Sequence, residues 1–312
     1  MAVKVNEFYQ AAQKKASLTL VTGQRGLARR IYEPAIHRPG LALAGFLRSF
    51  AFRCIQVLGT AEHEYLLAKP EQQRTESLRR LFQRRIPCLI ITRNRRVWPV
   101  ILKLAHEANV AVMRTPLITG TLINIATVIM ENLMAPRITI QGTMVDIMGI
   151  GVLIEGKPGI GKSEAAMTLI ERGHSLVADD VTVLRRSDDR TLIGSAVEVT
   201  RYYMEIRGLG IIHVPSIFGV AAIRNEMRLD MIVSLRKMEE LEDNGRWLKP
   251  QARNVLGIAV PHLTIPVSPG REIASLIALA ALNEKLKRLG RDAAQELDEK
   301  LMLKLARKGQ TQ

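Results

Sequence analysis

Hydrophobic residues recur along this 312-residue chain at two spacings, which predict alternating strands and helices in its first part. Four short apolar runs are typical of buried strands: residues 19–21, 54–58, 88–91 and 110–113. The stretches at residues 73–83 and 99–108 between them read as helices instead. Such alternation predicts an α/β domain.

The pattern also predicts where this domain ends. A helix is expected from about residue 119 to residue 133, directly before Ala135 and Pro136. Proline restricts the residue before it, so a helix commonly ends there. We therefore predict an N-terminal α/β domain of residues 1–131 and a second domain of residues 132–312.

The second domain opens with a predicted hairpin that leads into a glycine-rich loop. Residues 144–148 and 151–154 read as its two strands, turned at Gly149 and Ile150. Eight residues then fit the pattern G-x-x-x-x-G-K-[ST]: Gly156, Lys157, Pro158, Gly159, Ile160, Gly161, Lys162 and Ser163.

This order of strand, loop and helix predicts a site for a nucleoside triphosphate. Glycines let backbone N–H groups surround the phosphates, Lys162 can reach the β and γ oxygens, and the Ser163 hydroxyl can hold Mg²⁺. Apolar residues after the loop recur at helical spacing, with Gly173 as a C-terminal cap. The start of that helix adds a partial positive charge at the phosphates.

Two adjacent carboxylates follow the next apolar run, residues 175–178. We expect this strand to lie beside the strand that leads into the loop. Asp179 and Asp180 would then lie at the phosphates, one to hold Mg²⁺ and the other to accept a proton from an acceptor hydroxyl.

Composition excludes several classes of protein. An apolar content of 47% with 4% aromatic residues is typical of a globular protein. The longest apolar runs reach about half of a membrane-spanning length, and no signal peptide is recognised, so a cytoplasmic protein is expected. Cys54 and Cys88 lack metal-site spacing and are expected to be buried, reduced thiols.

A net charge of +15 requires nucleic-acid binding to be considered. The basic residues, however, are scattered in small groups such as Arg29 with Arg30 and Arg84 with Arg85, without a recognised nucleic-acid motif. Nucleic acid is therefore not the expected partner.

Together with the segment of residues 204–213, these motifs resemble those of a known family, the bacterial HPr kinase/phosphorylases. The resemblance rests on GKPGIGKSE, RGH with LVADD, EIRGLGII, IFG and IPVSPGR in this order. It extends into the first domain through RCIQVLGTAEHEYL, IPCLIIT and ENLMAP, and so covers almost the whole chain.

The resemblance implies an N-terminal α/β domain and a C-terminal P-loop kinase domain of the phosphoenolpyruvate carboxykinase-like type. It implies that ATP with Mg²⁺ phosphorylates a serine of HPr, the phosphocarrier of the sugar phosphotransferase system, in the regulation of carbon metabolism. The reverse reaction would use inorganic phosphate and release pyrophosphate. A homohexamer is also implied.

Residue roles follow from the same resemblance. Lys162 would act on the transferring phosphate and Asp180 would accept and return the serine proton, while Ser163, Glu205 and Asp179 would hold Mg²⁺. Arg246 would be the catalytic arginine, with Arg271 as the alternative. The signature for both reactions comprises Met204, Glu205, Ile206, Arg207, Gly208, Leu209, Gly210, Ile211, Ile212 and His213. The loop linked to dephosphorylation comprises Val267, Ser268, Pro269, Gly270, Arg271 and Glu272.

The chain departs from the family pattern at informative positions. Gln141 replaces the family's active-site histidine, and an amide cannot exchange a proton near neutral pH. Glu272 replaces an asparagine and adds negative charge where phosphate would approach. We therefore predict a kinase whose phosphorylase activity is weakened or lost.

Two other functions stay open from the sequence. The same scaffold could phosphorylate a small molecule, because the nucleotide loop does not specify the acceptor. Alternatively, the chain could be a nucleotide-sensing regulator that has lost catalysis and uses its positive charge on nucleic acid.

Overall fold

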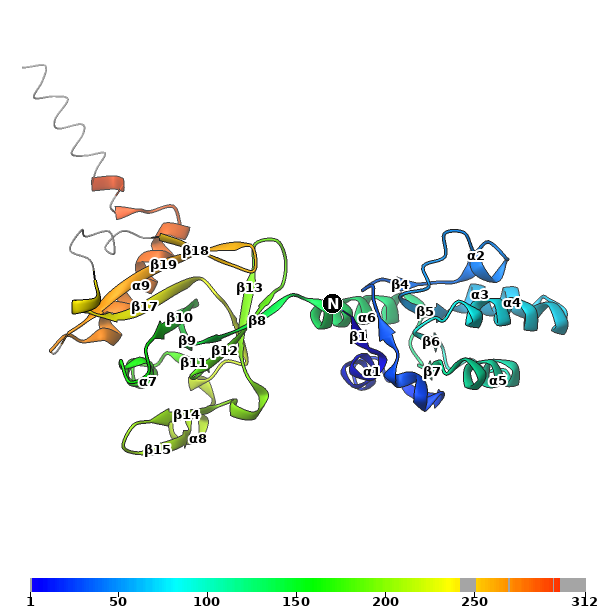
Figure 1. Ribbon diagram of the computed structural model, residues 1–312, viewed down its shortest axis with the longest axis horizontal. Coiled ribbons are helices and arrows are strands. Elements are labelled where there is room, and N and C mark those ends of the chain that lie inside the picture. The colour runs from blue at the N-terminus through cyan, green and yellow to red at the C-terminus, as the bar shows by residue number, and fades with distance from the viewer. Residues whose placement is uncertain (1, 242–250, 269, 294, 298–312) are drawn as a thin grey trace, which may run out of the picture. The chain divides into compact units, whose positions relative to one another are not determined.

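A computed structural model describes residues 2–241, 251–268, 270–293 and 295–297 of the chain. It divides into two compact units, residues 1–135 and 136–312, which are described separately below. Figure 1 gives the positions of the elements within each unit.

The N-terminal unit contains a five-stranded sheet with helices on both faces, as the alternating pattern predicts. Its order is β2 (Thr19–Thr22), β7 (Ala111–Arg114), β6 (Cys88–Ile91), β5 (Ile55–Leu58) and β4 (Ile36–His37), with only β2 antiparallel to its neighbour. A separate pair joins β1 (Val3–Lys4) to β3 (Arg30–Ile31). The α-helices are α1 (Val5–Gln13), α2 (Gly40–Leu43), α3 (Thr60–Leu67), α4 (Glu71–Gln83), α5 (Pro99–Ala108) and α6 (Thr119–Met134), and a 3₁₀ helix spans Gln24–Ala28.

Successive strand residues of this sheet pack against different helices. Ile90 contributes to a core with α1 and α6, whereas Leu89 and Ile91 contribute to a core with α3, α4 and α5. Because side chains alternate across a strand, a sheet covered on both faces requires continuous apolar strands. Cys54 and Cys88 are buried, unbridged thiols, as predicted. Burial raises the pKa of Cys54 to about 11 and raises that of Cys88 further.

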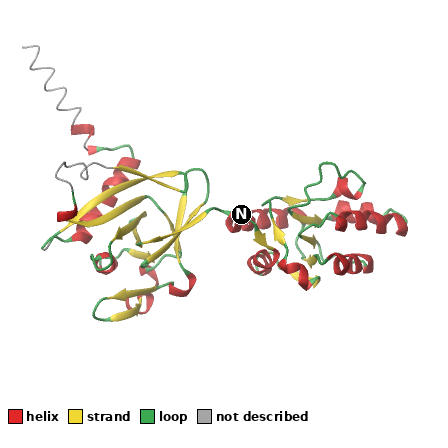
Figure 2. Cartoon of the chain, in the orientation of Figure 1, coloured by secondary structure: helices red, strands yellow, loops and turns green. Residues whose placement is uncertain are grey.

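The C-terminal unit is built mainly of strands (Figure 2). Its largest sheet has the order β11 (Ser175–Ala178), β9 (Thr143–Ile147), β10 (Ile150–Gly156), β17 (Met231–Lys237), β19 (Ile258–Val267) and β18 (Gln251–Val255). A second sheet has the order β16 (Glu226–Arg228), β13 (Leu192–Ala196), β12 (Val181–Arg186) and β8 (Arg137–Gln141). A separate antiparallel ribbon joins β14 (Tyr203–Ile206) to β15 (Gly210–His213).

The α-helices among the described residues of the C-terminal unit include α7 (Lys162–Glu171), α8 (Val214–Phe218) and α9 (Ile273–Arg288). Short 3₁₀ helices span Glu198–Thr200, Val220–Ala222 and Met238–Glu240. On β10, Val152 and Ile154 share a core with α7 and α9, whereas Leu153 joins a core that includes Leu184 of β12. The alternation along β10 therefore fixes which side of the sheet carries α7.

Two local predictions are wrong. The β9–β10 hairpin turns at Met148 and Gly149, one residue earlier than predicted, because both residues have the positive φ that a tight hairpin turn requires. In addition, β11 does not lie beside β10. The second hairpin strand, β9, lies between them and pairs antiparallel with both.

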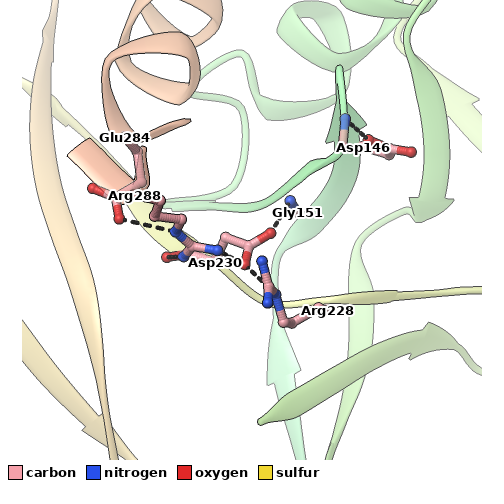
Figure 3. A network of polar contacts seen from close by, with 7 residues as sticks. Asp146, Gly151, Arg228, Asp230, Glu284 and Arg288 are labelled. Atoms are coloured by element: carbon pink, nitrogen blue, oxygen red, sulfur yellow. Dashed lines mark hydrogen bonds and ion pairs between the residues drawn. The ribbon is translucent and has the colours of Figure 1, made fainter. Parts of the chain in front are cut away.

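A buried carboxylate anchors α9 to the sheet (Figure 3). Asp230, which is 1% exposed, accepts hydrogen bonds from the backbone N–H of Gly151 at 2.7 Å and from Arg228 Nε at 2.6 Å. Arg288 of α9 donates Nη1 to the same carboxylate and Nη2 to the Asp230 carbonyl oxygen, and its Nε donates to Glu284. Buried charge is stable only when it is paired in this way.

Candidate active site

The glycine loop joins the end of β10 to the start of α7. Gly161 has φ +104° and occupies the N-terminal cap of α7, a conformation that residues with a Cβ adopt only at a cost. Lys162 is the first helical residue and is only 9% exposed. Its Nζ donates hydrogen bonds to the carbonyl oxygens of Gly156 at 3.1 Å and Lys157 at 3.3 Å. The loop's own backbone therefore positions the ammonium group.

Asp179 is the hydrogen-bonding centre of the site. Its Oδ1 accepts from Thr143 Oγ1 at 2.8 Å and from Ser163 Oγ at 3.1 Å, and its Oδ2 accepts from the backbone N–H of Glu205 at 3.1 Å. Burial raises the pKa of Asp179 above its ordinary value, while the three donors and the neighbouring charge of Asp180 act as smaller influences. The carboxylate thus links the loop, β9 and the β14–β15 ribbon.

These groups line one pocket of about 540 Å³. Its lining residues are Pro158, Gly159, Gly161, Lys162, Ser163, Glu164, Asp179, Asp180, Glu205 and Arg207. Cationic and oxygen-bearing side chains therefore converge in front of a helix N-terminus, which is the arrangement that binds phosphate with a hard cation.

Asp180 follows Asp179 in a left-handed conformation, with φ +61°. Its carbonyl oxygen accepts a hydrogen bond from the backbone N–H of Gly142 at 2.8 Å. Gln141 lies opposite Val181 in the β8–β12 pair and is exposed, and it does not line the pocket. Gln141, at the family's histidine position, therefore pairs with the residue directly after Asp180, but it is not one of the residues that line the pocket.

The signature segment forms the β14–β15 ribbon and its turn. Met204 and Ile212 are buried in the core that carries α7, whereas Leu209 and Ile211 are exposed. The tight turn at residues 207–209 brings Arg207 to the pocket. The remaining members, Glu205, Ile206, Gly208, Gly210 and His213, lie on the strands or the turn; His213 Nδ1 contacts Ser216 Oγ at 2.7 Å.

The described residues of the loop predicted for dephosphorylation are not among those that line this pocket. Val267 ends β19, Pro269 lies outside the described residues, and the Arg271 backbone N–H donates to the Ser268 carbonyl. Glu272 binds Arg172 and accepts from Ser275 Oγ at 2.7 Å, and these contacts lower its pKa, Ser275 first. Arg246 also lies outside the described residues.

Sequence reasoning missed three contacts at the site. Thr143 had no distinguishing signal, because a threonine at the start of a strand is an ordinary strand former. Arg172 was not expected to neutralise Glu272. Lys157 pairs with Glu240 at 2.7 Å, across 83 positions in sequence, and both border a second pocket of about 400 Å³ with Ser234 and Arg236.

Comparisons with known proteins assign both units to the same protein family. The family model described as the HPr serine kinase N terminus matches residues 3–130, and the model of the HPr serine kinase C-terminal domain matches residues 132–301. No helix in the described part of the chain is long and apolar enough to cross a membrane.

Curated relatives match over nearly the full length. The HPr kinase/phosphorylase of Caldicellulosiruptor bescii is 38% identical, covering 94% of this chain and 95% of the relative. That of Chloroherpeton thalassium is 37% identical, with 98% and 91% covered, and that of Bacillus licheniformis is 39% identical, with 92% and 93% covered. A solved HPr(Ser) kinase/phosphatase from Coxiella burnetii is 38% identical with a TM-score of 0.46, covering 51% of this chain and 98% of that chain. The chain belongs to the HPr serine kinase family.

Proposed function

We propose that this protein transfers the γ-phosphoryl group of ATP to a serine of HPr. The observation that carries the proposal is one pocket in which Lys162, the Ser163–Asp179 pair and Asp180 converge. The relatives' name, HPr kinase/phosphorylase, gives the acceptor and the reverse reaction. Family membership favours this function over a small-molecule kinase or a nucleic-acid-binding regulator.

The side chains of the pocket fit Mg²⁺. Within the described residues, no three His, Cys, Asp or Glu side chains gather to form a closed metal cage. Mg²⁺ needs only one or two carboxylates when substrate phosphates and waters complete its shell. We propose that Ser163, Asp179 and Glu205 would hold Mg²⁺, which supplies positive charge at the phosphates when bound.

The proposed chemistry requires one proton acceptor. In the forward direction the serine oxygen attacks the γ-phosphorus, the bond to the ADP oxygen breaks, and Asp180 accepts the hydroxyl proton. In reverse, inorganic phosphate attacks the phosphoserine phosphorus, protonated Asp180 returns its proton to the serine oxygen, and pyrophosphate leaves. Lys162 stabilises the charge on the transferring group in both directions. Arg246 is proposed as a further donor to that group.

We also propose that phosphorolysis is weak in this protein, because Gln141 can neither exchange a proton near neutral pH nor carry the positive charge of a histidine. The pairing of Glu272 with Arg172 offsets the repulsion that its carboxylate would exert on phosphate. Gln141 is therefore the stronger of the two reasons.

We also propose that the protein is a cytoplasmic homohexamer and that its two domains divide between residues 131 and 132. The boundary between the two compact units of the structure falls between residues 135 and 136, four residues from that division.

Labelled ATP and Mg²⁺ should phosphorylate purified HPr in a reaction that Asp180→Asn abolishes. Asparagine tolerates the left-handed backbone of this position, so the change removes the proton acceptor with little strain. Asp189→Asn, at a side chain 97% exposed, is the matched control and should retain activity. ATP binding without transfer to HPr in the unaltered protein would refute the proposal. Added phosphate should then release pyrophosphate slowly compared with the forward rate.

A further inference from the structure

The N-terminal unit carries most of the chain's net positive charge. Residues 1–135 contain 20 lysines and arginines, 8 glutamates and no aspartate, which gives +12 of the total +15. All the residues that line the phosphate pocket belong to the C-terminal unit. The proposed kinase reaction therefore leaves this concentration of charge unexplained.

Four of these arginines surround a pocket of about 590 Å³ within the N-terminal unit. Its lining residues are Ala28, Arg29, Arg30, Tyr32, Phe52, Arg53, Arg85 and Pro87. The pairs Arg29 with Arg30 and Arg84 with Arg85 are separate in sequence, and the fold brings members of both pairs to one cavity. A pocket of this volume suits a small-molecule ligand.

The arginines lack acidic partners. Among the residues that the structure describes, none of the four forms an ion pair with a carboxylate. Arg29 is half-buried and fixed, with Nη1 donating to the Ala108 carbonyl at 3.0 Å and Nη2 donating to that of Arg85. Burial, and then the charge of Arg85, lower the pKa of Arg29. Unneutralised guanidinium groups at a cavity attract an anion, and their planar donors match phosphate oxygens.

Two aromatic rings stand beside these cations. Tyr32 is 56% exposed and Phe52 is 39% exposed. The guanidinium carbon of Arg53 lies 5.7 Å from the Phe52 ring centre and 6.0 Å from that of Tyr32, and the Tyr32 N–H donates to the Arg53 carbonyl at 3.0 Å. Exposed rings next to a planar cation form a surface on which a nucleobase can stack.

We propose that this pocket is a second nucleotide site, separate from the phosphate loop. Arg30 and Arg85, with Arg29 fixed between backbone carbonyls, hold the ligand's phosphate. Tyr32, Phe52 and Arg53 contact its base. The ligand class is a nucleoside monophosphate, which combines one anionic group with one planar ring and does not require Mg²⁺.

Titration calorimetry of the full chain with AMP and with UMP, in EDTA, tests this site. At least one of the two should bind, and its affinity should fall about tenfold in Arg53→Ala and in Arg85→Ala, as expected for loss of a charged contact. Ribose 5-phosphate and the free nucleoside should each bind more weakly, because each lacks one of the two groups. Lys162→Ala, which alters only the phosphate loop, should leave this binding unchanged.

Arg48→Ala is the matched control. Arg48 is exposed, belongs to the same unit and does not line the pocket, so its removal lowers the general positive charge equally. The circular dichroism spectrum and thermal unfolding of Arg53→Ala should match those of the unaltered protein, which verifies that the variant is folded. Equal weakening by Arg48→Ala would overturn the proposal, as would the absence of binding by either monophosphate. Binding restricted to single-stranded oligonucleotides would also overturn it, in favour of nucleic acid.

Discussion

Ser163 donates a hydrogen bond of 3.1 Å from its hydroxyl to the buried carboxylate of Asp179. This contact joins the start of α7, directly after the glycine loop, to the residue that follows β11. Thr143 shares the same carboxylate oxygen. Two of the side chains proposed for Mg²⁺, those of Ser163 and Asp179, are thus already joined by a hydrogen bond within the protein.

The raised pKa of Asp179 predicts a pH dependence of stability. The folded protein holds this proton more tightly than the unfolded chain, so the contribution to stability is greatest at low pH. It is lost as pH rises from the ordinary value of 3.8 through the raised pKa. In EDTA, the Tm of the unaltered protein relative to Asp179→Asn should therefore fall with rising pH. Thermal unfolding followed by circular dichroism measures this difference, and parallel Tm profiles would contradict it.

Removal of the loop lysine should strongly slow transfer without unfolding the protein. Lys162 contacts only backbone carbonyls in the hydrogen bonds described above, and its charge is positioned for the phosphates. Lys162→Ala should lower the rate of HPr phosphorylation about a hundredfold or more, as when other charge-stabilising donors are lost. Lys103→Ala, an exposed lysine of α5, should leave the rate unchanged. A Lys162→Ala enzyme with nearly full activity would exclude the proposed role.

Restoration of the family's histidine should strengthen the reverse reaction. Gln141 is exposed and pairs with Val181, the residue after Asp180, so Gln141→His introduces an imidazole at this position of the sheet without overpacking a core. General acid–base groups commonly contribute about a hundredfold or more, and we expect phosphorolysis to rise at least about tenfold relative to phosphorylation. The gain should depend on pH near neutrality, where histidine titrates. Gln141→Asn is the control. Equal phosphorolysis in all three proteins would show that another residue limits this reaction.

Asp230 should be important for stability rather than for catalysis. Its carboxylate is 1% exposed and binds two arginines and the Gly151 N–H, whereas Arg228 is half-exposed. Asp230→Asn should cost about 2 to 3 kcal/mol of unfolding free energy, because charged hydrogen bonds are lost in a buried setting. Arg228→Ala should cost less, since its guanidinium already contacts water. Urea unfolding measures both, and equal losses would refute this ranking.

Much of the fold is predictable from the sequence because local patterns determine it. The helix of residues 99–108 has the predicted bounds, and the glycine loop follows its strand as the motif requires. The strand order was not predictable, since the pattern of β11 is compatible with more than one neighbour. The placement of β9 between β10 and β11 depends on the pairing of β9 with β11, which follows only after β10, the glycine loop and α7 in the sequence.

The candidate site was predictable to a similar degree. Lys162, Ser163, Asp179 and Asp180 meet in one pocket because a motif fixes two of them and a strand end presents the others. The contact of Glu272 with Arg172 was not predictable, because it joins side chains 100 positions apart on the surface. A sequence motif specifies chemistry within a few residues, whereas such tertiary partners require the fold.

The burial of Cys54 and Cys88 makes this protein suitable for site-specific labelling. Both thiols are inaccessible and stay protonated near neutral pH, so thiol reagents should leave the unaltered chain unmodified. A single cysteine placed at the exposed Leu209, at the turn of the β14–β15 ribbon, would then carry a fluorophore alone. The ribbon borders the phosphate pocket, and such a reporter would follow the binding of nucleotide there in real time.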